Sequence, residues 1–387
     1  MNFVFLSPHF PPNYYPFCVR LRELGAVVLG LADAPYDALR PELRGALAEY
    51  YRVDDMRDYD RLVRALGHFT HRYGRIDRID SHNEYWLETE AALRTDFNIP
   101  GLRSDAIEAV KRKSRMKEIY RRAGVAVARG GIARSLPDGL RIVAETGYPL
   151  VAKPDKGVGA AATFKIRDRA ELERFFARRP PVDYVLEEFI RGRIFSFDGL
   201  ADREGNLVFF TAHAYSQGIM ETVNADDHIS YYSLREIPPD LEDAGRRTAA
   251  AFGVRERFFH FEFFRRDDDG AVVALEVNMR PPGGLTTDMF NYANDIDIYR
   301  EWASVVVRNR FEARWSRPYH CGYIGRKNGK RYARSHAEVL AALGGLVVHH
   351  APMDSIFRDA VGDYGYLVRS PGLDDVLAAV RVVQELE

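Results

Sequence analysis

The chain has 387 residues, of which 46% are hydrophobic, so it is too long for one simple core and is expected to fold as two or three packed subdomains. The 55 basic and 56 acidic residues leave a formal charge of -1, which gives no reason to expect a nucleic acid or a membrane surface as partner. The two cysteines, Cys18 and Cys321, lie far apart in the sequence, and this favours a reduced, cytoplasmic protein over a disulfide-linked secreted one.

Short apolar segments alternate with helical patterns over the first hundred residues. We expect strands at residues 2–7, 26–31, 49–53 and 76–81 and a helix at 58–73, because a β-α-β alternation predicts a small doubly wound parallel sheet. The apolar run at residues 3–6 has no basic segment before it, so it indicates a strand and no signal peptide. No G-x-G-x-x-G follows the first strand, so the sequence assigns no dinucleotide to this domain.

Loops beyond the carboxyl ends of such strands are the usual place for a ligand. Three loops meet this condition, at residues 7–15, 33–37 and 82–84. They include Tyr15, Asn83 and Glu84, which could hold a substrate. An ordinary capped turn is an equal interpretation of each loop.

Residues 104–123 predict one basic helix that begins at Ser104 or Asp105 and ends at Gly124. Its cationic side chains are Lys111, Arg112, Lys113, Arg115, Lys117, Arg121 and Arg122. A solvated helical face is the usual meaning of such a run. At the junction with the next domain, however, one of the lysines could reach a phosphate of ATP.

A strand at residues 149–154 delivers Lys153 to its end, where proline breaks the chain. The loop that follows is rich in small residues and includes Lys156, Gly157, Gly159 and Ala160, so its backbone N–H groups can approach phosphate oxygens. It lacks the G-K-[ST] ending of a Walker A motif. A plain hairpin is the alternative interpretation.

Adjacent glutamates occur in the apolar strand expected over residues 184–190. Glu187 and Glu188 face opposite sides of that strand, so at least one points toward the interior or a cleft. Further strands are expected at 194–200, 207–213 and 230–233, followed by an amphipathic helix at 241–252.

The chain centres on residues 276–280, with Glu262 in another predicted strand upstream. Because strand side chains alternate, Glu276, Asn278 and Arg280 are expected on one face. A hard divalent cation bound to phosphate prefers such oxygen ligands, so the pattern predicts a magnesium and ATP site. The alternative is a buried salt bridge between Arg280 and one of the glutamates.

The last hundred residues predict a further small unit. We expect residues 285–307 to be mostly helical, strands at 320–326 and 346–352, and a final helix with an apolar stripe from 373 to 383. We interpret the tail as a small lid that covers the site.

The order of these motifs resembles the ATP-grasp superfamily: a lysine in a basic helix, a lysine before a glycine loop, Glu-Glu-Phe-Ile, and a glutamate followed by Glu-x-Asn-x-Arg. The general likeness is to carboxylate-amine ligases and to the biotin carboxylase and carbamoyl-phosphate synthetase group. It implies a chain of α/β and α+β class with a Rossmann-like domain at residues 1–103, a two-lobed ATP-grasp domain at 104–310 and a lid at 311–387. The implied parts of the ATP-grasp domain are a linker helix at 104–123 and lobes at 124–190 and 191–310.

The resemblance implies that two lysines hold the ATP phosphates, that the glycine loop covers them, and that a hinge between the lobes reads the adenine amino group. In chain order these residues are Lys113, Lys153, Gly157, Gly159, Ala160, Glu187, Glu188, Phe189 and Ile190. The chain departs from the family pattern twice. Ile194 stands where many relatives carry a ribose-binding acid, and Ala160 stands where serine is usual.

The resemblance also implies two magnesium ions, for which manganese can substitute, on Glu262, Glu276 and Asn278. Lys153 and Arg280 are the implied catalytic residues. The implied substrate contacts are Arg280, Asn83, Glu84, Lys156 and Tyr15.

The activity that follows is an ATP- and magnesium-dependent ligase, which activates a small-molecule carboxylate as an acyl phosphate and joins it to an amine. The alternatives are a carboxylase-like enzyme that activates bicarbonate, a kinase of a small acid, or a non-catalytic ATP-binding module that controls a partner. The partners expected are small molecules and, for a homodimer, a second copy of the chain.

Overall fold

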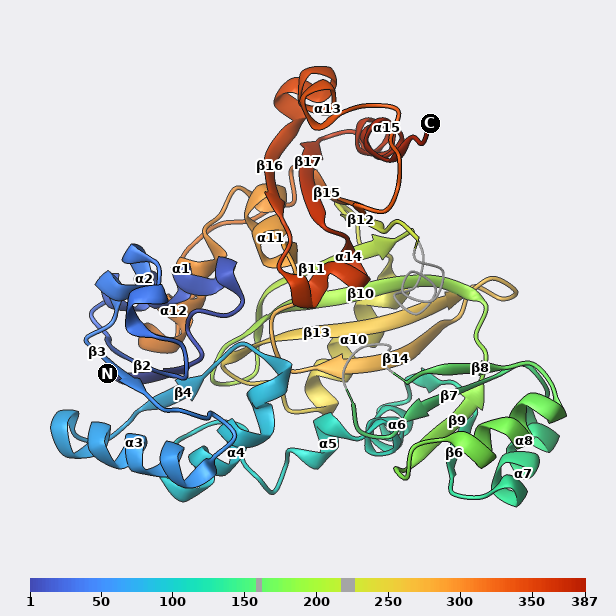
Figure 1. The fold of residues 1–387 in the computed structure, drawn as a ribbon, viewed down its shortest axis with the longest axis horizontal. Coiled ribbons are helices and arrows are strands. Elements are labelled where there is room, and N and C mark those ends of the chain that lie inside the picture. Colours follow the sequence, from blue (N-terminus) through green and yellow to red (C-terminus); the bar gives the residue numbers. More distant parts are fainter. Residues whose placement is uncertain (158–161, 217–226) are drawn as a thin grey trace.

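The computed structural model describes residues 1–157, 162–216 and 227–387. Three sheets organise the chain: a four-stranded sheet of order β3-β2-β1-β4, a nine-stranded sheet, and a second four-stranded sheet of order β6-β9-β7-β8. Figure 1 shows the N-terminal sheet at one end of the nine-stranded sheet and the second four-stranded sheet at the other. The predicted class, a parallel N-terminal sheet followed by a two-lobed α+β domain, is confirmed.

The N-terminal sheet is parallel throughout. Its elements are β1 (Asn2–Leu6), α1 (Tyr15–Glu23), β2 (Val27–Ala32), α2 (Pro41–Ala46), β3 (Glu49–Arg52), α3 (Tyr59–Tyr73), β4 (Arg78–Asp80) and α4 (Leu87–Asp96). The strands β1 and β2 are almost continuously apolar because helices cover both faces of a parallel sheet. Asp58 begins α3 by accepting a hydrogen bond from the Arg61 N–H, and Gly74 ends that helix.

The single helix predicted over residues 104–123 is wrong. The structure has α5 (Glu108–Lys111) and α6 (Lys113–Arg122), and neither begins at Ser104 or Asp105. The helix breaks at Arg112, which has extended backbone angles and forms an isolated β-bridge with Lys156. The Lys113 N–H then donates to the Asp155 carbonyl at 2.8 Å, so pairing with the glycine loop sets where α6 starts.

The smaller lobe folds around its own apolar core. Its elements are β6 (Gly130–Ala133), α7 (Leu136–Thr146), β7 (Leu150–Pro154), β8 (Phe164–Ile166), α8 (Arg169–Arg178) and β9 (Tyr184–Glu188). Side chains of the strands and of both helices, among them Ile142, Leu150 and Leu172, form one buried cluster. Both helices therefore cover one face of this sheet. The other face is left for contact with the larger lobe, which is built on the nine-stranded sheet.

The nine-stranded sheet has the order β16-β17-β15-β12-β11-β10-β13-β14-β5. Its strands are β5 (Ala126–Val127), β10 (Gly192–Ala201), β11 (Leu207–Tyr215), β12 (Ser230–Ser233), β13 (Arg257–Arg266), β14 (Val272–Asn278), β15 (His320–Arg326), β16 (Val347–Pro352) and β17 (Tyr364–Ser370). The helices around it are α10 (Pro239–Ala251), α11 (Thr286–Asn294), α12 (Ile298–Arg308), α13 (His336–Leu343), α14 (Arg358–Val361) and α15 (Leu373–Gln384). Although β5 lies in the predicted first lobe, it pairs with β14 of this sheet.

The C-terminal segment continues this sheet through the pairing of β12 with β15. The strand β17 was not predicted, although it is largely buried and pairs with both β15 and β16. Gly365 interrupts its apolar pattern, and a Cβ there would lie 2.8 Å from the Tyr323 ring. Close packing against the Tyr323 ring thus explains why a glycine stands at position 365, where it interrupts the apolar pattern from which the strand could have been predicted.

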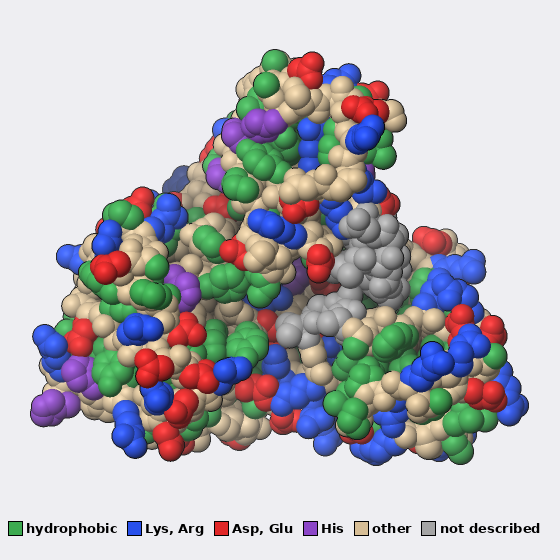
Figure 2. Space-filling view, viewed as in Figure 1, with side chains coloured by type: hydrophobic (Ala, Val, Ile, Leu, Met, Phe, Trp, Pro, Cys, Tyr) green, Lys and Arg blue, Asp and Glu red, His purple; other side chains and the backbone are tan. Residues whose placement is uncertain are grey.

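Charge on the surface is mixed. Figure 2 shows blue and red side chains interspersed over the N-terminal domain and the smaller lobe on this face of the molecule, in keeping with the balanced composition. Within the described residues, none of the helices has the length and apolar character needed to cross a membrane.

Candidate functional site

A cavity of about 360 Å³ lies between the smaller lobe and the nine-stranded sheet. It brings together ten of the residues selected from the sequence, namely Lys113, Lys153, Glu187, Glu188, Phe189, Ile190, Glu262, Glu276, Asn278 and Arg280. Apolar side chains, among them Val151, Phe264 and Leu275, line the same space. The cavity therefore joins an apolar region, which suits a flat heterocycle, to a strongly charged region.

On the side of the cavity formed by the smaller lobe, one buried carboxylate pairs with two lysines. Glu187 forms ion pairs with Lys153 and with Lys117, whose Nζ lies 2.5 Å from the second oxygen of Glu187. Burial acts to raise the pKa of Glu187, but the two ammonium groups outweigh it and the pKa ends below its ordinary value. Sequence reasoning missed Lys117, although its position one turn after Lys113 in the basic segment was a usable signal.

The segment between the lobes is fixed by local hydrogen bonds. The Glu188 carboxylate accepts from the Arg129 N–H and Nε, each at 2.8 Å, and the Phe189 N–H donates to the Pro149 carbonyl at 3.1 Å. The Lys165 ammonium lies 3.6 Å from the centre of the Phe189 ring. These contacts place the segment at the cavity wall, and its contact with adenine stays a prediction.

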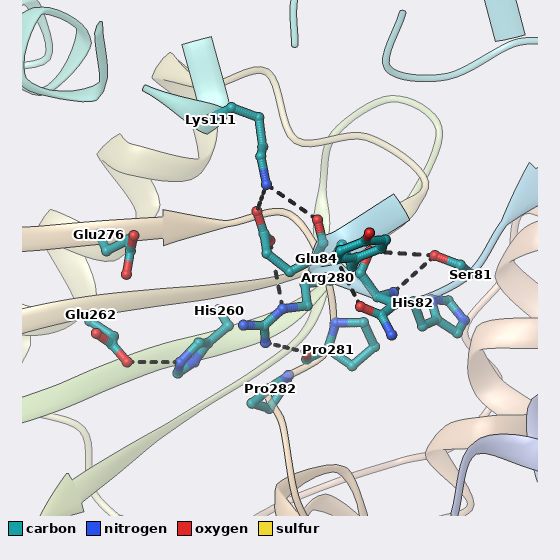
Figure 3. Close-up of polar contacts among 12 residues, drawn as sticks. Ser81, His82, Glu84, Lys111, His260, Glu262, Glu276, Arg280, Pro281 and Pro282 are labelled. Atoms are coloured by element: carbon teal, nitrogen blue, oxygen red, sulfur yellow. Dashed lines mark hydrogen bonds and ion pairs between the residues drawn. The ribbon is translucent and has the colours of Figure 1, made fainter. Parts of the chain in front are cut away.

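The acidic wall is formed by two paired strands. Glu262 on β13 stands directly opposite Glu276 on β14, and His260 stands opposite Asn278. The Lys113 ammonium lies 2.8 Å from Glu276. Burial acts to lower the pKa of Lys113, but Glu276 outweighs it and raises that pKa. In Figure 3 the carboxylates of Glu262 and Glu276 lie beside each other, with His260 next to Glu262.

These side chains suit a magnesium ion bound together with phosphate. No three Asp, Glu, His or Cys side chains of the described residues gather closely enough to hold a metal by themselves. Glu262, Glu276 and Asn278 supply two carboxylates and one amide oxygen, and magnesium is usually held by one or two carboxylates with substrate phosphates completing its shell. The donor set therefore fits the ion when a nucleotide is present.

His260 also lines the cavity, and sequence reasoning missed it. Its Nε2 lies 3.2 Å from Glu262, and its Nδ1 lies 2.5 Å from Asp198, which is also 2.7 Å from His213. Burial acts to lower the pKa of His260, but Asp198 outweighs it and raises the pKa to about 9. The signal was strand alternation, because His260 is two residues from Glu262 and shares its face.

Arg280 lies just beyond the end of β14, so its predicted place on the strand is wrong. Its Nε is 3.6 Å from Glu84, whose other oxygen is 2.6 Å from the Lys111 ammonium. Figure 3 shows Glu84 between Arg280 and Lys111. The ion pair of Arg280 thus joins the N-terminal domain to the larger lobe and does not involve Glu262 or Glu276, the partners that the alternative interpretation required.

Those of the remaining predicted residues that the structure describes lie outside the cavity lining, namely Tyr15, Asn83, Glu84, Lys156 and Gly157. The Asn83 side chain accepts a hydrogen bond from the Tyr85 N–H at 2.9 Å, and the Arg40 guanidinium covers the Tyr15 ring at 3.8 Å. Lys156 forms an ion pair with Glu88, and the Gly157 carbonyl accepts from Lys113 at 3.3 Å. Gly159 and Ala160 fall outside the described residues.

One family model matches the chain. Residues 146–288 match the model described as an ATP-grasp domain. Among curated proteins, the chloroplastic arginine-specific large chain of carbamoyl phosphate synthase from Oryza sativa subsp. japonica is 31% identical over 128 residues. The matched segment covers 32% of this chain and only 10% of that protein.

Solved structures match over nearly the full length. L-amino acid ligase from Bacillus licheniformis aligns with a TM-score of 0.78 at 18% identity and covers 100% of this chain and 97% of its own. The biotin carboxylase domain of 2-oxoglutarate carboxylase from Hydrogenobacter thermophilus, in complex with MgADP, ADP and bicarbonate, aligns with a TM-score of 0.70 at 19% identity and covers 97% of this chain and 89% of its own. At this level of identity the likeness concerns the fold.

Proposed function

Because the chain contains an ATP-grasp domain, we propose that it is an ATP- and magnesium-dependent ligase that activates a small-molecule carboxylate as an acyl phosphate and joins it to an amine. The products are ADP, phosphate and the amide. The observation that carries the proposal is one cavity lined by Lys113 and Lys153 together with Glu262, Glu276 and Asn278. A nucleotide phosphate chain and its magnesium ions need this combination of cations and oxygen ligands.

The proposed orientation of the nucleotide follows from the polarity of the cavity. Adenine occupies the apolar part near Val151, Phe264 and Leu275, and the phosphates extend toward Lys113 and Lys153. Magnesium, held with the phosphates, neutralises charge on the transferred phosphoryl group. Ile194 lines the cavity where many relatives carry an acid, so the ribose contacts of this chain differ from those of such relatives.

The proposed reaction needs no nucleophile from the protein. A carboxylate oxygen of the substrate attacks the γ-phosphorus and the bond to the ADP oxygen breaks, which yields the acyl phosphate. The amine then attacks the acyl carbon, loses a proton, and expels phosphate. Lys153 and Arg280 stabilise the negative charge that spreads over the transferred group and the acyl oxygens.

Glu84 does not line the cavity, but it lies next to Arg280, which does. Its Oε2 is buried and has no hydrogen-bond partner among the described residues, although Arg280 lies 3.6 Å away. A buried carboxylate oxygen of this kind is expected to accept a hydrogen bond from a ligand. We assign it the amine of the second substrate, with Arg280 facing the carboxylate of the first.

We also propose the domain boundaries at residues 103/104, 190/191 and 310/311. In this arrangement the C-terminal segment contributes Phe357, Ala360 and Val361 to the cavity wall, whereas Glu84 of the N-terminal domain lies outside the lining, beside Arg280. The ATP-grasp domain and the C-terminal segment therefore enclose the proposed substrates, and the N-terminal domain contacts this region through the Glu84–Arg280 ion pair.

The proposal is tested with purified protein, ATP, magnesium, a panel of pooled carboxylates and hydroxylamine as the trapping amine. An acyl phosphate reacts with hydroxylamine to give a hydroxamate, so the expected result is hydroxamate formed together with ADP and dependent on one carboxylate pool. Binding of ATP without hydroxamate or ADP release across the whole panel would reject the ligase. ADP release with a stable phosphorylated acid and no hydroxamate would indicate a kinase instead.

A further inference from the structure

A second cavity, of about 670 Å³, shares none of the residues that line the first. It lies between the edge strand β4, the segment 100–106, the start of β13 and helix α12. Its lining contains more cationic than anionic side chains. The cationic members are Arg78, Arg94, Arg103, Arg203, Arg255 and Arg257, whereas the anionic members are Asp80, Asp105 and Glu256.

Two of these carboxylates are each shared by two arginines. Glu256 accepts hydrogen bonds from Arg78 at 2.6 and 3.1 Å and from Arg203 at 2.6 Å. Asp80 lies 3.6 Å from both Arg94 and Arg257. Arg94 also pairs at 2.9 Å with Glu90, which is fully buried and is not part of the lining. Even with Glu90 included, the arginines around this cavity outnumber the carboxylates, in a chain whose total charge is close to zero.

Arg257 is the decisive side chain because it is buried and incompletely paired. It is 8% exposed, and its buried Nε has no hydrogen-bond partner among the described residues. Its ion pair with Asp80 is longer than a hydrogen bond. A buried charged donor without an acceptor is costly, so an anion in the space that Arg257 lines would offset part of that cost.

The rest of the lining is apolar. Phe3, Leu102, Phe252, Trp302 and Val306 contribute to the walls. We propose that this cavity binds a small organic anion, whose carboxylate or phosphate group lies against Arg257 and whose apolar body packs against these side chains. The volume suits a ligand of metabolite size. This inference does not depend on the proposed ligase activity, because no residue of the first cavity takes part.

Isothermal titration of the full-length chain tests this site with two probes, phenylacetate and phenyl phosphate, which carry the same apolar ring and distinguish a carboxylate from a phosphate ligand. We expect at least one of them to bind. Arg257→Lys keeps the positive charge but removes Nε and the planar fork, and Arg255→Gln changes an exposed residue of the same cavity. Each variant is expected to weaken binding by about tenfold or more.

Lys153→Ala is the matched control, since Lys153 lines only the first cavity. It is expected to bind the probes as the unmodified chain does. The inference is overturned if neither probe binds, if both arginine variants bind with unchanged affinity, or if Lys153→Ala abolishes binding. If Arg257→Lys fails to fold, as judged by circular dichroism, the result with Arg255→Gln decides.

Discussion

The Lys113 ammonium lies 2.8 Å from the Glu276 carboxylate, so the first residue of α6 forms an ion pair with a residue of β14 inside the proposed site. The same ammonium is 3.3 Å from the Gly157 carbonyl in the glycine loop. In the proposed reaction Glu276 binds magnesium and Lys113 binds phosphate. The two side chains neutralise each other in this structure and would exchange partners when MgATP binds.

Lys113→Met is expected to change metal and nucleotide affinity in opposite directions. Without the ammonium, the charge of Glu276 is free to attract a cation, so Mn²⁺ alone should bind roughly tenfold more tightly, whereas ATP should bind more weakly. Electron paramagnetic resonance of free Mn²⁺ and titration with ATP measure the two affinities. The control Arg115→Met changes an exposed cation on the same helix. Unchanged Mn²⁺ affinity in Lys113→Met would contradict the proposed competition.

Glu276→Gln is expected to lower turnover by at least about a hundredfold, because a neutral amide holds magnesium poorly and charge neutralisation dominates phosphoryl transfer. ADP release under saturating substrate measures the effect, and near-UV circular dichroism should show an unchanged fold. Asp268→Asn, at the exposed turn between β13 and β14, is the matched control. Full activity in Glu276→Gln would refute the metal assignment.

Glu187→Gln is expected to destabilise the protein because it leaves Lys117 and Lys153 buried without their carboxylate. Removing one partner of a buried ion pair costs about 3–5 kcal/mol in the free energy of unfolding, which urea denaturation can measure. Adding Lys117→Met should recover part of that loss. Glu188→Gln, which removes a contact to the exposed Arg129, should cost about 1 kcal/mol or less. Equal losses in the two glutamate variants would show that Glu187 has no special role.

His82 is expected to make the protein sensitive to acid. Burial lowers its pKa from 6.5 to about 4, although Asp80 opposes the shift. The unfolded chain therefore takes up a proton between these pH values while the folded protein does not. The contribution of His82 to the free energy of unfolding should fall by up to about 3 kcal/mol as the pH drops through that range. Glu90, whose pKa burial raises to about 7, contributes in the opposite direction, so the effect of His82 is the difference between the protein and its His82 variant.

Urea denaturation at neutral pH and near pH 5 measures this slope. His82→Asn should reduce the slope, since asparagine tolerates the positive φ of 56° at this position. The substitution should also lower the free energy of unfolding at both pH values, because it removes the His82 ring. The centre of that ring lies 4.2 Å from the centre of the Phe17 ring and 4.5 Å from that of Trp302. The exposed His71→Asn should leave the slope unchanged.

Elements whose pattern is local were predictable from the amino-acid sequence alone. Alternation along β13 and β14 was sufficient to place Glu262, Glu276 and Asn278 on one face, and the structure pairs Glu262 with Glu276. The apolar runs of the first hundred residues likewise predicted a parallel sheet, because strands buried on both faces read as continuous apolar segments.

Which charged side chains pair with one another is evident only from the folded structure. The break at Arg112 arises from pairing with Lys156, and Glu187 is held by two lysines from different elements. Arg280 forms its ion pair with Glu84, which lies in the N-terminal domain. The cavity that Arg257 lines is formed by segments that are far apart in the sequence. A side chain's burial and its nearest opposite charge depend on the packing of distant segments, and periodicity along a strand or helix carries no information about that packing.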